Sequence, residues 1–360
     1  MCDISTEDQL LEFARKAAES GDQTQTFEFK KHIGFLIRHL NVFPQPYNTL
    51  ETSRNTIFLF AISSLDLLGE LDNLLTPERR QAYIDWIYGL QFTNGNVCGF
   101  RGSHSCENSG YDEANLAQTY SALLSLAILG DDLKKVDRKA ILKTVKTAQR
   151  DNGCFWSQGV GSESDMRFVF CAVAISHILD GDKEQTIDWT KLAGFLRQSL
   201  NIDGGIGQAP GDESHGGSTF CAIASLALSN RLWTEEVLTR RDIDRLIRWA
   251  IQKQDIGFHG RAHKPDDSCY AFWIGATLKI LNAYHLVSKQ HLREFLMICQ
   301  HPHIGGFCKY PEPGGYSDIL HTYFSIAALS LLGEPAVNPV HPSLNVSMRV
   351  AERIARLQFD

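Results

Sequence analysis

The sequence lacks the features that define several large classes of protein. No apolar run reaches the roughly 18 residues of a membrane-spanning helix. Basic residues are not in excess, since the formal charge is −7, whereas nucleic-acid-binding proteins typically carry a basic stripe. The first residues, MCDISTEDQLLEF, have neither the basic start nor the apolar core of a secretory signal. We therefore expect a cytoplasmic protein with no membrane span and no nucleic-acid partner.

The nine cysteines show no regular pattern. Their number is odd, their spacings are irregular, and several stand in apolar segments such as FVFCAVAI. Disulfide frameworks and paired zinc-binding cysteines both have regular spacings, so we read these residues as reduced thiols that mostly fill the core. With 43% apolar and 21% charged residues, the composition is that of a globular protein, and 360 residues suffice for one large domain or two ordinary ones.

A unit of about fifty residues is repeated along the chain. Glycines at 99, 153, 205, 257 and 306 stand in the similar segments CGFRG, DNGCFW, DGGIGQ, DIGFHGR and IGGFCKY, which are 54, 52, 52 and 49 residues apart. Each glycine segment is followed by a polar loop and then by an apolar helix rich in small residues. The regular spacing indicates that one structural unit is used several times.

The helices are of two kinds. Nearly apolar segments at 53–71, 114–130, 164–179, 215–229, 267–281 and 318–333 alternate with amphipathic segments at 77–91, 137–150, 190–201 and 241–254. This alternation predicts two concentric rings, and so an all-α fold: an α/α toroid of about six inner and outer helix pairs. An open solenoid is the alternative, but the inner helices are too apolar to line an open groove. We expect residues 46–360 to form the barrel and residues 1–45 to add a helical segment to the same domain.

Side chains at the start of the apolar helices should meet at one rim, because each helix follows a glycine turn. Among them are Asp267, Cys269 and His321. Carboxylate, thiolate and imidazole form a typical three-ligand zinc set with an open fourth position. The alternative is a capping aspartate, a buried thiol and a core histidine. Asp318 would cap the last helix or orient His321, and Asp266 is expected to be solvated.

A second set at the rim consists of cations and other donors. Its members are His215, Arg261, Lys264, Lys309 and Tyr270. Several cations on one rim of an acidic protein suggest an anion such as phosphate, although each could instead form an ordinary salt bridge. The glycines around His215, in SHGGST, would let the backbone approach a ligand.

Aromatic side chains are frequent on the inner helices below this rim. They include Phe60, Tyr120, Phe168, Phe170, Phe220, Phe272, Trp273, Tyr323 and Phe324. Such residues usually form core. Beside a rim that binds zinc and diphosphate, they become a candidate well for an isoprenoid tail.

The sequence resembles the β subunits of protein prenyltransferases, and most closely the type I geranylgeranyl enzymes. The matching segments are LETSRNTI, CGFRGS, ILGDDL, GSESDMRFVFCA, ESHGGSTFCAIASL, GFHGRAHKPDDSCYAFWIGATLK, GGFCKYP, DILHTYF and HPSLNVSMR. They extend from about residue 45 to 355. The loop at 102–112 is shorter than is typical of this family and Phe170 is less typical, so the resemblance leaves the opening of the lipid well undefined.

The resemblance implies a fold, a partner and a set of site residues. It implies an α/α barrel that works with an α subunit shared with the farnesyl enzyme, and one zinc ion. The zinc ligands would be Asp267, Cys269 and His321, and the diphosphate would be bound by His215, Arg261, Lys264 and Tyr270, with Lys309. The lipid pocket would contain Thr56, Tyr120, Phe170, Cys221, Trp273 and Phe324. The substrate peptide would contact Arg167, Phe60 and Leu320.

Two positions bear on the subtype. Farnesyl enzymes have a tryptophan where this chain has Thr56, and the smaller side chain leaves room for a fourth isoprene unit. They also have a magnesium-binding aspartate where this chain has Lys309, so magnesium should not be required. Rab enzymes share the zinc set but differ around the HGRAHKP segment. The alternatives to a type I geranylgeranyl β subunit are the β subunit of a farnesyl enzyme and that of a Rab enzyme.

The expected reaction joins a geranylgeranyl group to a protein cysteine. The acceptor would be a small GTPase or similar protein ending in Cys-a-a-X, often with leucine at X, and the donor would be geranylgeranyl diphosphate. A zinc-bound thiolate would attack C1 of the lipid. A noncatalytic helical scaffold and an α/α-barrel hydrolase or terpene cyclase are rivals from other classes. The acidic motifs that such a hydrolase or cyclase needs do not stand out.

Overall fold

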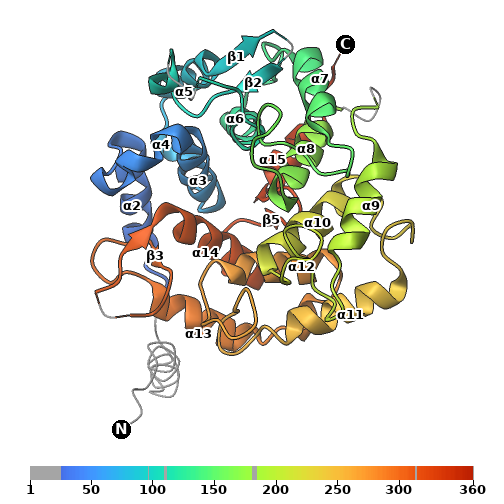
Figure 1. Ribbon diagram of the computed structural model, residues 1–360. Coiled ribbons are helices and arrows are strands. Elements are labelled where there is room, and N and C mark those ends of the chain that lie inside the picture. The colour runs from blue at the N-terminus through green and yellow to red at the C-terminus, as the bar shows by residue number, and fades with distance from the viewer. Residues whose placement is uncertain (1–25, 96, 109–111, 181–184, 313, 360) are drawn as a thin grey trace.

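Two concentric rings of helices form most of the molecule. The computed structural model describes residues 26–95, 97–108, 112–180, 185–312 and 314–359. Within these residues, the inner ring consists of α3 (Arg54–Leu67), α6 (Leu116–Leu129), α8 (Met166–Ile178), α10 (Gly216–Leu228), α12 (Tyr270–Ile280) and α14 (Ile319–Leu332). The outer ring consists of α2 (Phe29–Asn41), α5 (Pro77–Gly89), α7 (Arg138–Ala148), α9 (Trp189–Ser199), α11 (Arg240–Ile251) and α13 (Lys289–Cys299). Figure 1 shows the outer helices surrounding the inner ones.

The inner ring is closed. Each inner helix packs against the next one along the chain, and α14 returns to pack against α3. This contact confirms the predicted α/α toroid of helix pairs and excludes the open solenoid, whose first and last helices would not touch. The outer helix α2 comes from the predicted N-terminal segment, of which residues 1–25 lie outside the described part. The boundary at residue 45 remains a prediction.

Side-chain polarity explains which helices lie inside. The inner helix α6 buries 12 of its 14 residues, and most of these are leucine, alanine or serine, so its neighbours can approach on several sides. The outer helix α11 buries only Ile243, Leu246, Trp249 and Ala250, which recur every three or four residues and form one stripe. The charged residues between them face outward. The two sequence patterns therefore correspond to the two rings.

A glycine turn links outer helices to the inner helices that follow. Gly153 and Gly305 have φ angles of +92° and +76°, and a Cβ on either would lie 2.1–2.2 Å from a carbonyl oxygen, of Lys191 and Lys31 respectively. Only glycine fits both the backbone angle and this close approach. Single β-bridges recur at the turns, pairing Gln149 with Phe155, Leu200 with Ile206, Gln254 with Phe258 and Gln300 with Phe307. The fifty-residue repeat of the sequence is thus a repeat of structure.

The described strands are short and form antiparallel pairs only. They are β1 (Gln91–Asn94) with β2 (Val97–Phe100), β3 (Phe307–Cys308) with β4 (Ser317–Asp318), and β5 (Val340–His341) with β6 (Val346–Ser347). The remaining helices are α4 (Leu71–Leu74), α15 (Met348–Ala355), and the 3₁₀ helices η1 (Gln45–Ser53), η2 (His104–Cys106) and η4 (Tyr284–Leu286). In the β5–β6 pair, Val340 faces Ser347 and His341 faces Val346. None of the helices in the described ranges is long and apolar enough to cross a membrane.

The hairpin β5–β6 reaches the interior of the inner ring. Figure 1 shows β5 near the centre of that ring. The Tyr120 hydroxyl donates to the Leu344 carbonyl at 3.1 Å, and the Tyr323 hydroxyl donates to the Asn345 carbonyl. Both tyrosines belong to inner helices, so these bonds fasten the hairpin turn to the inside of the barrel.

Candidate functional site

The carboxylate of Asp267, the thiol of Cys269 and the imidazole of His321 meet at the rim. One ligand atom of each lies within 4.8 Å of those of the other two. Asp267 Oδ1 accepts the backbone N–H of Cys269 at 3.0 Å and lies 3.3 Å from Nε2 of His321. Asp267 and Cys269 are buried just before α12, and His321 is in the first turn of the neighbouring α14. The structure thus brings the three predicted zinc ligands together.

The electrostatics of this set favour a cation. Burial raises the pKa of the Cys269 thiol, and the adjacent Asp267 carboxylate raises it further. Burial would also raise the pKa of Asp267, but the hydrogen bond and charge of His321 lower it. In the same way burial opposes protonation of His321, yet the bonds to Asp267 and Asp318 raise its pKa to about 9. Positive charge beside Asp267 is therefore stabilised, and a carboxylate, a thiol and an imidazole are donors that suit zinc.

The loop that carries Lys309 is tied to the same site. The backbone N–H of Ser268 donates to the Lys309 carbonyl at 3.1 Å, and its hydroxyl donates to the Cys308 carbonyl at 2.9 Å. The Lys309 ammonium lies 3.8 Å from Oδ2 of Asp267 and its side chain is 49% exposed. Lys309 therefore stands between the buried carboxylate and the open rim.

His215 and Tyr270 form a donor pair on the adjacent helices α10 and α12. The backbone N–H groups of Gly217 and Ser218 donate to Nδ1 of His215 at 3.0 and 3.3 Å, so Nδ1 carries no proton. Burial and the charge of Arg261 lower the pKa of His215, which keeps the ring neutral with its proton on Nε2. Nε2 lies 2.9 Å from the Tyr270 oxygen. Because His215 donates to it, the Tyr270 hydroxyl hydrogen is free for an anion.

A polar cavity of about 410 Å³ adjoins this pair. It is lined by Gln208, Asp212, Glu213, His215 and Arg261. The Arg261 guanidinium lies 3.9 Å from the Glu213 carboxylate and is 46% exposed, so this weak ion pair leaves it accessible. Lys264 is exposed in the loop that follows. The predicted diphosphate-binding residues therefore lie on one stretch of the rim, around α10 and α12.

A large apolar cavity of about 650 Å³ opens beside the zinc-type set, since His321 is part of its lining. The other predicted residues that line it are Thr56, Phe60, Tyr120, Arg167, Phe170, Cys221, Trp273, Leu320 and Phe324. These come from the first two turns of all six inner helices, so the N-terminal ends of these helices meet at one rim. A volume of this size is typical of small-molecule sites, which span roughly 300–1,000 Å³.

Each inner helix contributes one aromatic side chain to an open collar along this cavity, which runs from Tyr120 to Phe60. Ring centroids are 5.3 Å apart for Tyr120–Phe170, 5.6 Å for Phe170–Phe220, 5.0 Å for Phe220–Trp273, 4.1 Å for Trp273–Phe324 and 5.7 Å for Phe324–Phe60. Such contacts are favourable beyond simple burial and they stiffen the wall.

Thr56 lines the large cavity from the first turn of α3. Its hydroxyl lies 2.9 Å from that of Ser121 and 3.2 Å from Oε1 of Gln118. In the closed ring α3 stands opposite α10, which carries His215. Thr56 therefore lines the cavity on the side away from the donor pair.

Arg167 occupies a fixed position at the cavity wall. Asp165 caps the helix by accepting the Arg167 backbone N–H at 2.8 Å, and its carboxylate also accepts from Nε at 3.0 Å. Glu163 forms a second ion pair with the guanidinium. The side chain is half exposed. Two carboxylates therefore orient a cation that still faces solvent.

Sequence reasoning missed several polar side chains of the cavity. Gln118, Ser121 and Asn345 line it, as does Tyr47. Asn345 is 6% exposed and its Oδ1 has no hydrogen-bond partner. The segment HPSLNVSMR stands out in the sequence, but nothing in its pattern indicates that its turn enters the barrel.

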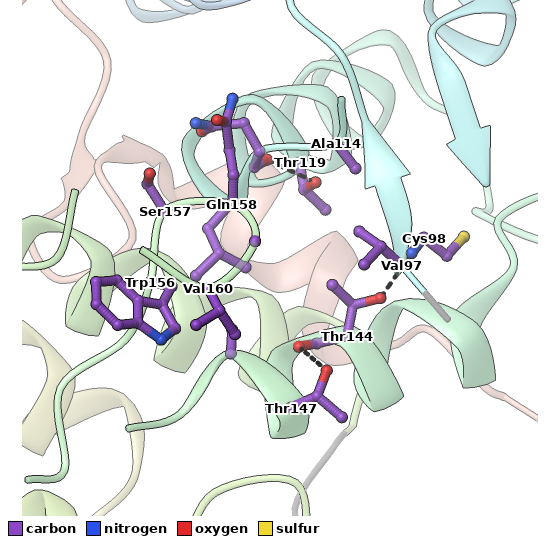
Figure 2. Close-up of a pocket in the computed structure, with 14 residues that line it drawn as sticks. Val97, Cys98, Ala114, Thr119, Thr144, Thr147, Trp156, Ser157, Gln158 and Val160 are labelled. Carbon is purple, nitrogen blue, oxygen red and sulfur yellow. Dashed lines mark hydrogen bonds between the residues drawn. The ribbon is translucent and has the colours of Figure 1, made fainter. Parts of the chain in front are cut away.

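A smaller cavity of about 170 Å³ lies elsewhere, between β2, α7 and the loop that follows α7. Figure 2 shows Trp156, Gln158 and Val160 of this loop on one side and Val97 and Cys98 on the other. The predicted site residues are not among its lining residues. This cavity is therefore separate from the candidate site.

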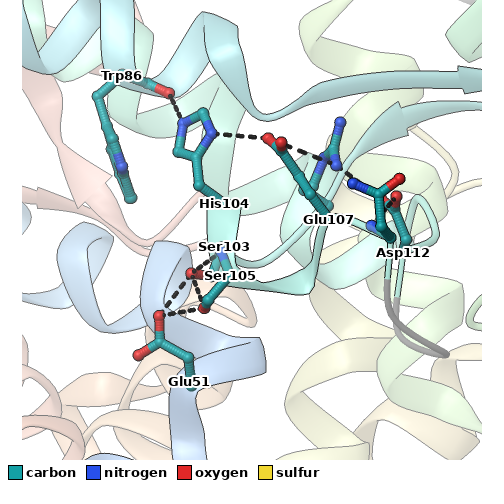
Figure 3. Close-up of polar contacts among 9 residues, drawn as sticks. Glu51, Trp86, Ser103, His104, Ser105, Glu107 and Asp112 are labelled. Carbon is teal, nitrogen blue, oxygen red and sulfur yellow. Dashed lines mark hydrogen bonds and ion pairs between the residues drawn. The ribbon is translucent and has the colours of Figure 1, made fainter.

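The loop after β2 is fastened to the helix η1, which adjoins α3. The hydroxyls of Ser103 and Ser105 each donate to Oε1 of Glu51 at 2.6 Å (Figure 3). Partial burial would raise the pKa of Glu51, but these bonds and those from Arg54 lower it to about 2. Leu50 of η1 lines the large cavity, so the loop supports one wall of it. Of the 102–112 loop, residues 109–111 lie outside the described part.

Comparisons with known proteins agree with this arrangement. A family model described as a prenyltransferase alpha-alpha toroid domain matches residues 27–346. The geranylgeranyl transferase type-1 subunit beta of Dictyostelium discoideum is 38% identical over 351 residues, covering 89% of this chain and 96% of that protein. The Arabidopsis thaliana protein of the same name is 36% identical over 354 residues, covering 91% of each.

A solved structure has the same fold. It is the Candida albicans protein geranylgeranyltransferase-I complexed with GGPP, which matches 93% of this chain and 100% of that chain with a TM-score of 0.84 and 26% identity. The closed toroid, the length of the family match and the identity to the two curated proteins lead to one assignment. The chain belongs to the prenyltransferase alpha-alpha toroid family, among the type-1 geranylgeranyl transferase β subunits.

Proposed function

We propose that this chain is the catalytic β subunit of a zinc-dependent protein geranylgeranyltransferase of type I. It transfers a geranylgeranyl group from geranylgeranyl diphosphate to the cysteine of a C-terminal Cys-a-a-X sequence. The observation that carries the proposal is the position of the Asp267–Cys269–His321 set at the edge of the 650 Å³ apolar well, which His321 itself lines. A thiol acceptor and a lipid donor can meet there.

Zinc fits the donor set of this site. Asp267 and Cys269 offer one oxygen and one sulfur, and His321 offers Nε2 because its Nδ1 donates to Asp318 at 2.5 Å. When bound, zinc lowers the pKa of a substrate thiol and holds it as a thiolate. Asp318 supplies the second hydrogen bond that fixes the imidazole.

The cationic side of the rim fits the diphosphate leaving group. Negative charge grows on the leaving oxygen as the bond to C1 breaks, and donors that are already oriented stabilise that charge. The neutral His215 orients the Tyr270 hydroxyl toward the anion. Arg261, Lys264 and Lys309 add positive charge. Because Lys309 already provides a cation beside Asp267, the reaction does not require magnesium.

The apolar well fits a twenty-carbon chain. Burial contributes about 0.8 kcal/mol per CH₂, so the lipid gains on the order of 10 kcal/mol before its entropy cost is subtracted. The collar from Tyr120 to Phe60 supplies most of the wall. Thr56, where a tryptophan would narrow the well, supports the longer lipid over the farnesyl alternative. Arg167, Phe60 and Leu320 lie along the same cavity and contact the peptide.

The proposed enzyme works as a heterodimer in the cytoplasm. The partner is the α subunit shared with protein farnesyltransferase, and the acceptors are small GTPases and similar proteins. A reducing compartment agrees with the eight cysteines that the structure describes, which are all buried. The Candida albicans structure, which contains GGPP, supports the choice of donor.

The test is a transfer assay combined with a metal analysis. The chain is purified with the α subunit and incubated with geranylgeranyl diphosphate and a peptide that ends in Cys-a-a-Leu. We expect one zinc at the Asp267–Cys269–His321 set of each β chain and a thioether product. Cys269→Ala should lose both the zinc and the transfer while it still binds the lipid donor. Full activity of Cys269→Ala would contradict the proposal, and a metal-free, inactive wild type would favour the noncatalytic scaffold.

A further inference from the structure

Asp266 is buried, although its position in a polar loop next to Asp267 led us to expect a solvated side chain. It is 7% exposed. Its Oδ2 accepts the backbone N–H of Gly257 at 2.7 Å, whereas its Oδ1 is buried and has no hydrogen-bond partner. A buried carboxylate oxygen without a hydrogen bond is unfavourable and calls for a positive partner.

The group that faces this oxygen is the imidazole of His259, whose Nδ1 is also buried without a hydrogen bond. The two atoms are 3.5 Å apart, which is longer than the 2.7–3.2 Å of an N–H···O bond. Oδ2 of Asp255 lies 3.9 Å from the same Nδ1, and one ligand atom from each of the three residues lies within 4.8 Å of the others.

We propose that Asp255, His259 and Asp266 form a second metal site, which binds one divalent transition cation such as Zn²⁺. Ligands about 2.1 Å from a tetrahedral zinc lie roughly 3.4 Å apart, close to the spacing of these atoms. An imidazole nitrogen with two carboxylate oxygens suits zinc and its neighbours in the first transition series better than magnesium or calcium, which prefer oxygen alone.

The backbone holds the three donors in place. The His259 N–H donates to the Lys253 carbonyl at 3.0 Å, and the Asp267 N–H donates to the Phe258 carbonyl at 3.0 Å. Gly257 has no room for a side chain, since a Cβ would lie 2.4 Å from the Phe295 ring. The segment 253–259 is thereby fixed against the segment 266–267 before any cation binds.

The position of this site gives it a structural effect. Asp266 directly precedes the candidate zinc ligand Asp267, and His259 lies two residues before Arg261 of the polar rim. Asp255 is 52% exposed and leaves a route for the cation from solvent. A cation here would lock the loop of the diphosphate site to the loop of the catalytic metal without touching the substrate.

Cobalt distinguishes this site from the one that contains Cys269. The full-length chain, purified with its α subunit, is stripped with a chelator and titrated with Co²⁺. A site with a thiolate gives an intense sulfur-to-cobalt charge-transfer band, whereas nitrogen and oxygen donors give only weak d–d bands. We expect two Co²⁺ per β chain, of which one lacks the charge-transfer band. The number of bound Co²⁺ ions does not depend on transfer activity. A count of one would therefore refute the second metal site without refuting the proposed function.

Matched variants assign the second cation to these residues. Asp266→Asn keeps the size of the side chain and an acceptor for Gly257, and should bind one Co²⁺ with an unchanged charge-transfer band. Asp255→Asn alters a half-exposed side chain and should weaken the second site at least tenfold. Cys269→Ser should lose the band and keep the second cation. The exposed His263 provides the control, because His263→Asn should still bind two.

One Co²⁺ per wild-type chain at saturation would overturn the proposal and identify the His259–Asp266 contact as an ordinary ion pair. Two Co²⁺ in both Asp255→Asn and Asp266→Asn would overturn it as well, because the second ion would then bind elsewhere on the surface.

Discussion

Asp318 holds His321 at two points. One carboxylate oxygen accepts the backbone N–H of His321 at 2.9 Å and caps α14, while the other accepts the ring Nδ1–H at 2.5 Å. A single residue therefore begins the helix, selects the imidazole tautomer and turns Nε2 toward Asp267. The capping role and the orienting role, which the sequence offered as alternatives, occur together.

Asp318→Asn should weaken zinc binding while the helix remains intact. Asparagine keeps an oxygen for the cap but loses the charge that holds the ring, and removal of such orienting partners typically costs 10–100-fold in metal affinity. The measurement is a competition titration with a zinc chelator, with circular dichroism as the check on folding. Ser317→Ala, which removes only a bond to the Gly305 carbonyl, serves as the control. Unchanged zinc affinity in Asp318→Asn would show that Asp318 is a cap alone.

The two rings could be predicted because their signals are periodic: apolar and amphipathic segments alternate along the chain. The site residues depended on more than spacing, since their roles were assigned from the family resemblance. The contact between α14 and α3 agrees with that prediction.

The features that escaped prediction depend on contacts between distant segments. Asp266 is buried because the Gly257 turn folds back on it, which no local pattern of charge reveals. Asn345 reaches the cavity through a hairpin with two-residue strands, which are too short to show a period.

Lys309→Asp should make transfer dependent on magnesium. The wild-type ammonium supplies fixed positive charge beside Asp267, and an aspartate would replace it with negative charge that requires a cation. The rate should be low without magnesium and recover over a millimolar titration, whereas the wild-type rate should stay flat. Lys309→Ala is the matched control, since it lacks both charges and should be slow at every magnesium concentration. If the transfer rate of Lys309→Asp does not change with magnesium concentration, Lys309 has another role.

Thr56→Trp should shift the preference from geranylgeranyl to farnesyl diphosphate. The indole would project from the wall of α3 into the cavity, and forcing the longer lipid past it costs about 1–3 kcal/mol or more, or roughly 5- to 150-fold in preference. The ratio of products in a mixture of both donors measures the effect. Thr56→Ser keeps the hydroxyl contact with Ser121 and should retain the original preference. A tryptophan variant that still prefers the longer donor would place the lipid end elsewhere.

The stability of the fold should fall as pH drops below neutral, partly through His32. Burial lowers its pKa from 6.5 to about 4, and the neutral ring accepts the Gly306 N–H at 3.0 Å. Because the unfolded chain binds the proton more tightly, the contribution of His32 is complete above about pH 6.5 and is lost as pH falls toward 4. The full loss amounts to about 3 kcal/mol.

Urea unfolding of wild type and His32→Asn tests this statement. The asparagine can accept the same N–H but does not titrate, so the variant should lose less unfolding free energy than the wild type between about pH 7 and pH 4.5. Equal losses in the two proteins would mean that His32 does not carry the pH dependence.

The most direct test of the central claim is a competition between the two lipid donors. The chain, purified with its α subunit, is given equal concentrations of geranylgeranyl and farnesyl diphosphate and a peptide that ends in Cys-a-a-Leu, without magnesium. Mass spectrometry then identifies the lipid on the cysteine. We predict that most of the product is geranylgeranylated. A product that is mainly farnesylated, or no thioether at all, would contradict the assignment.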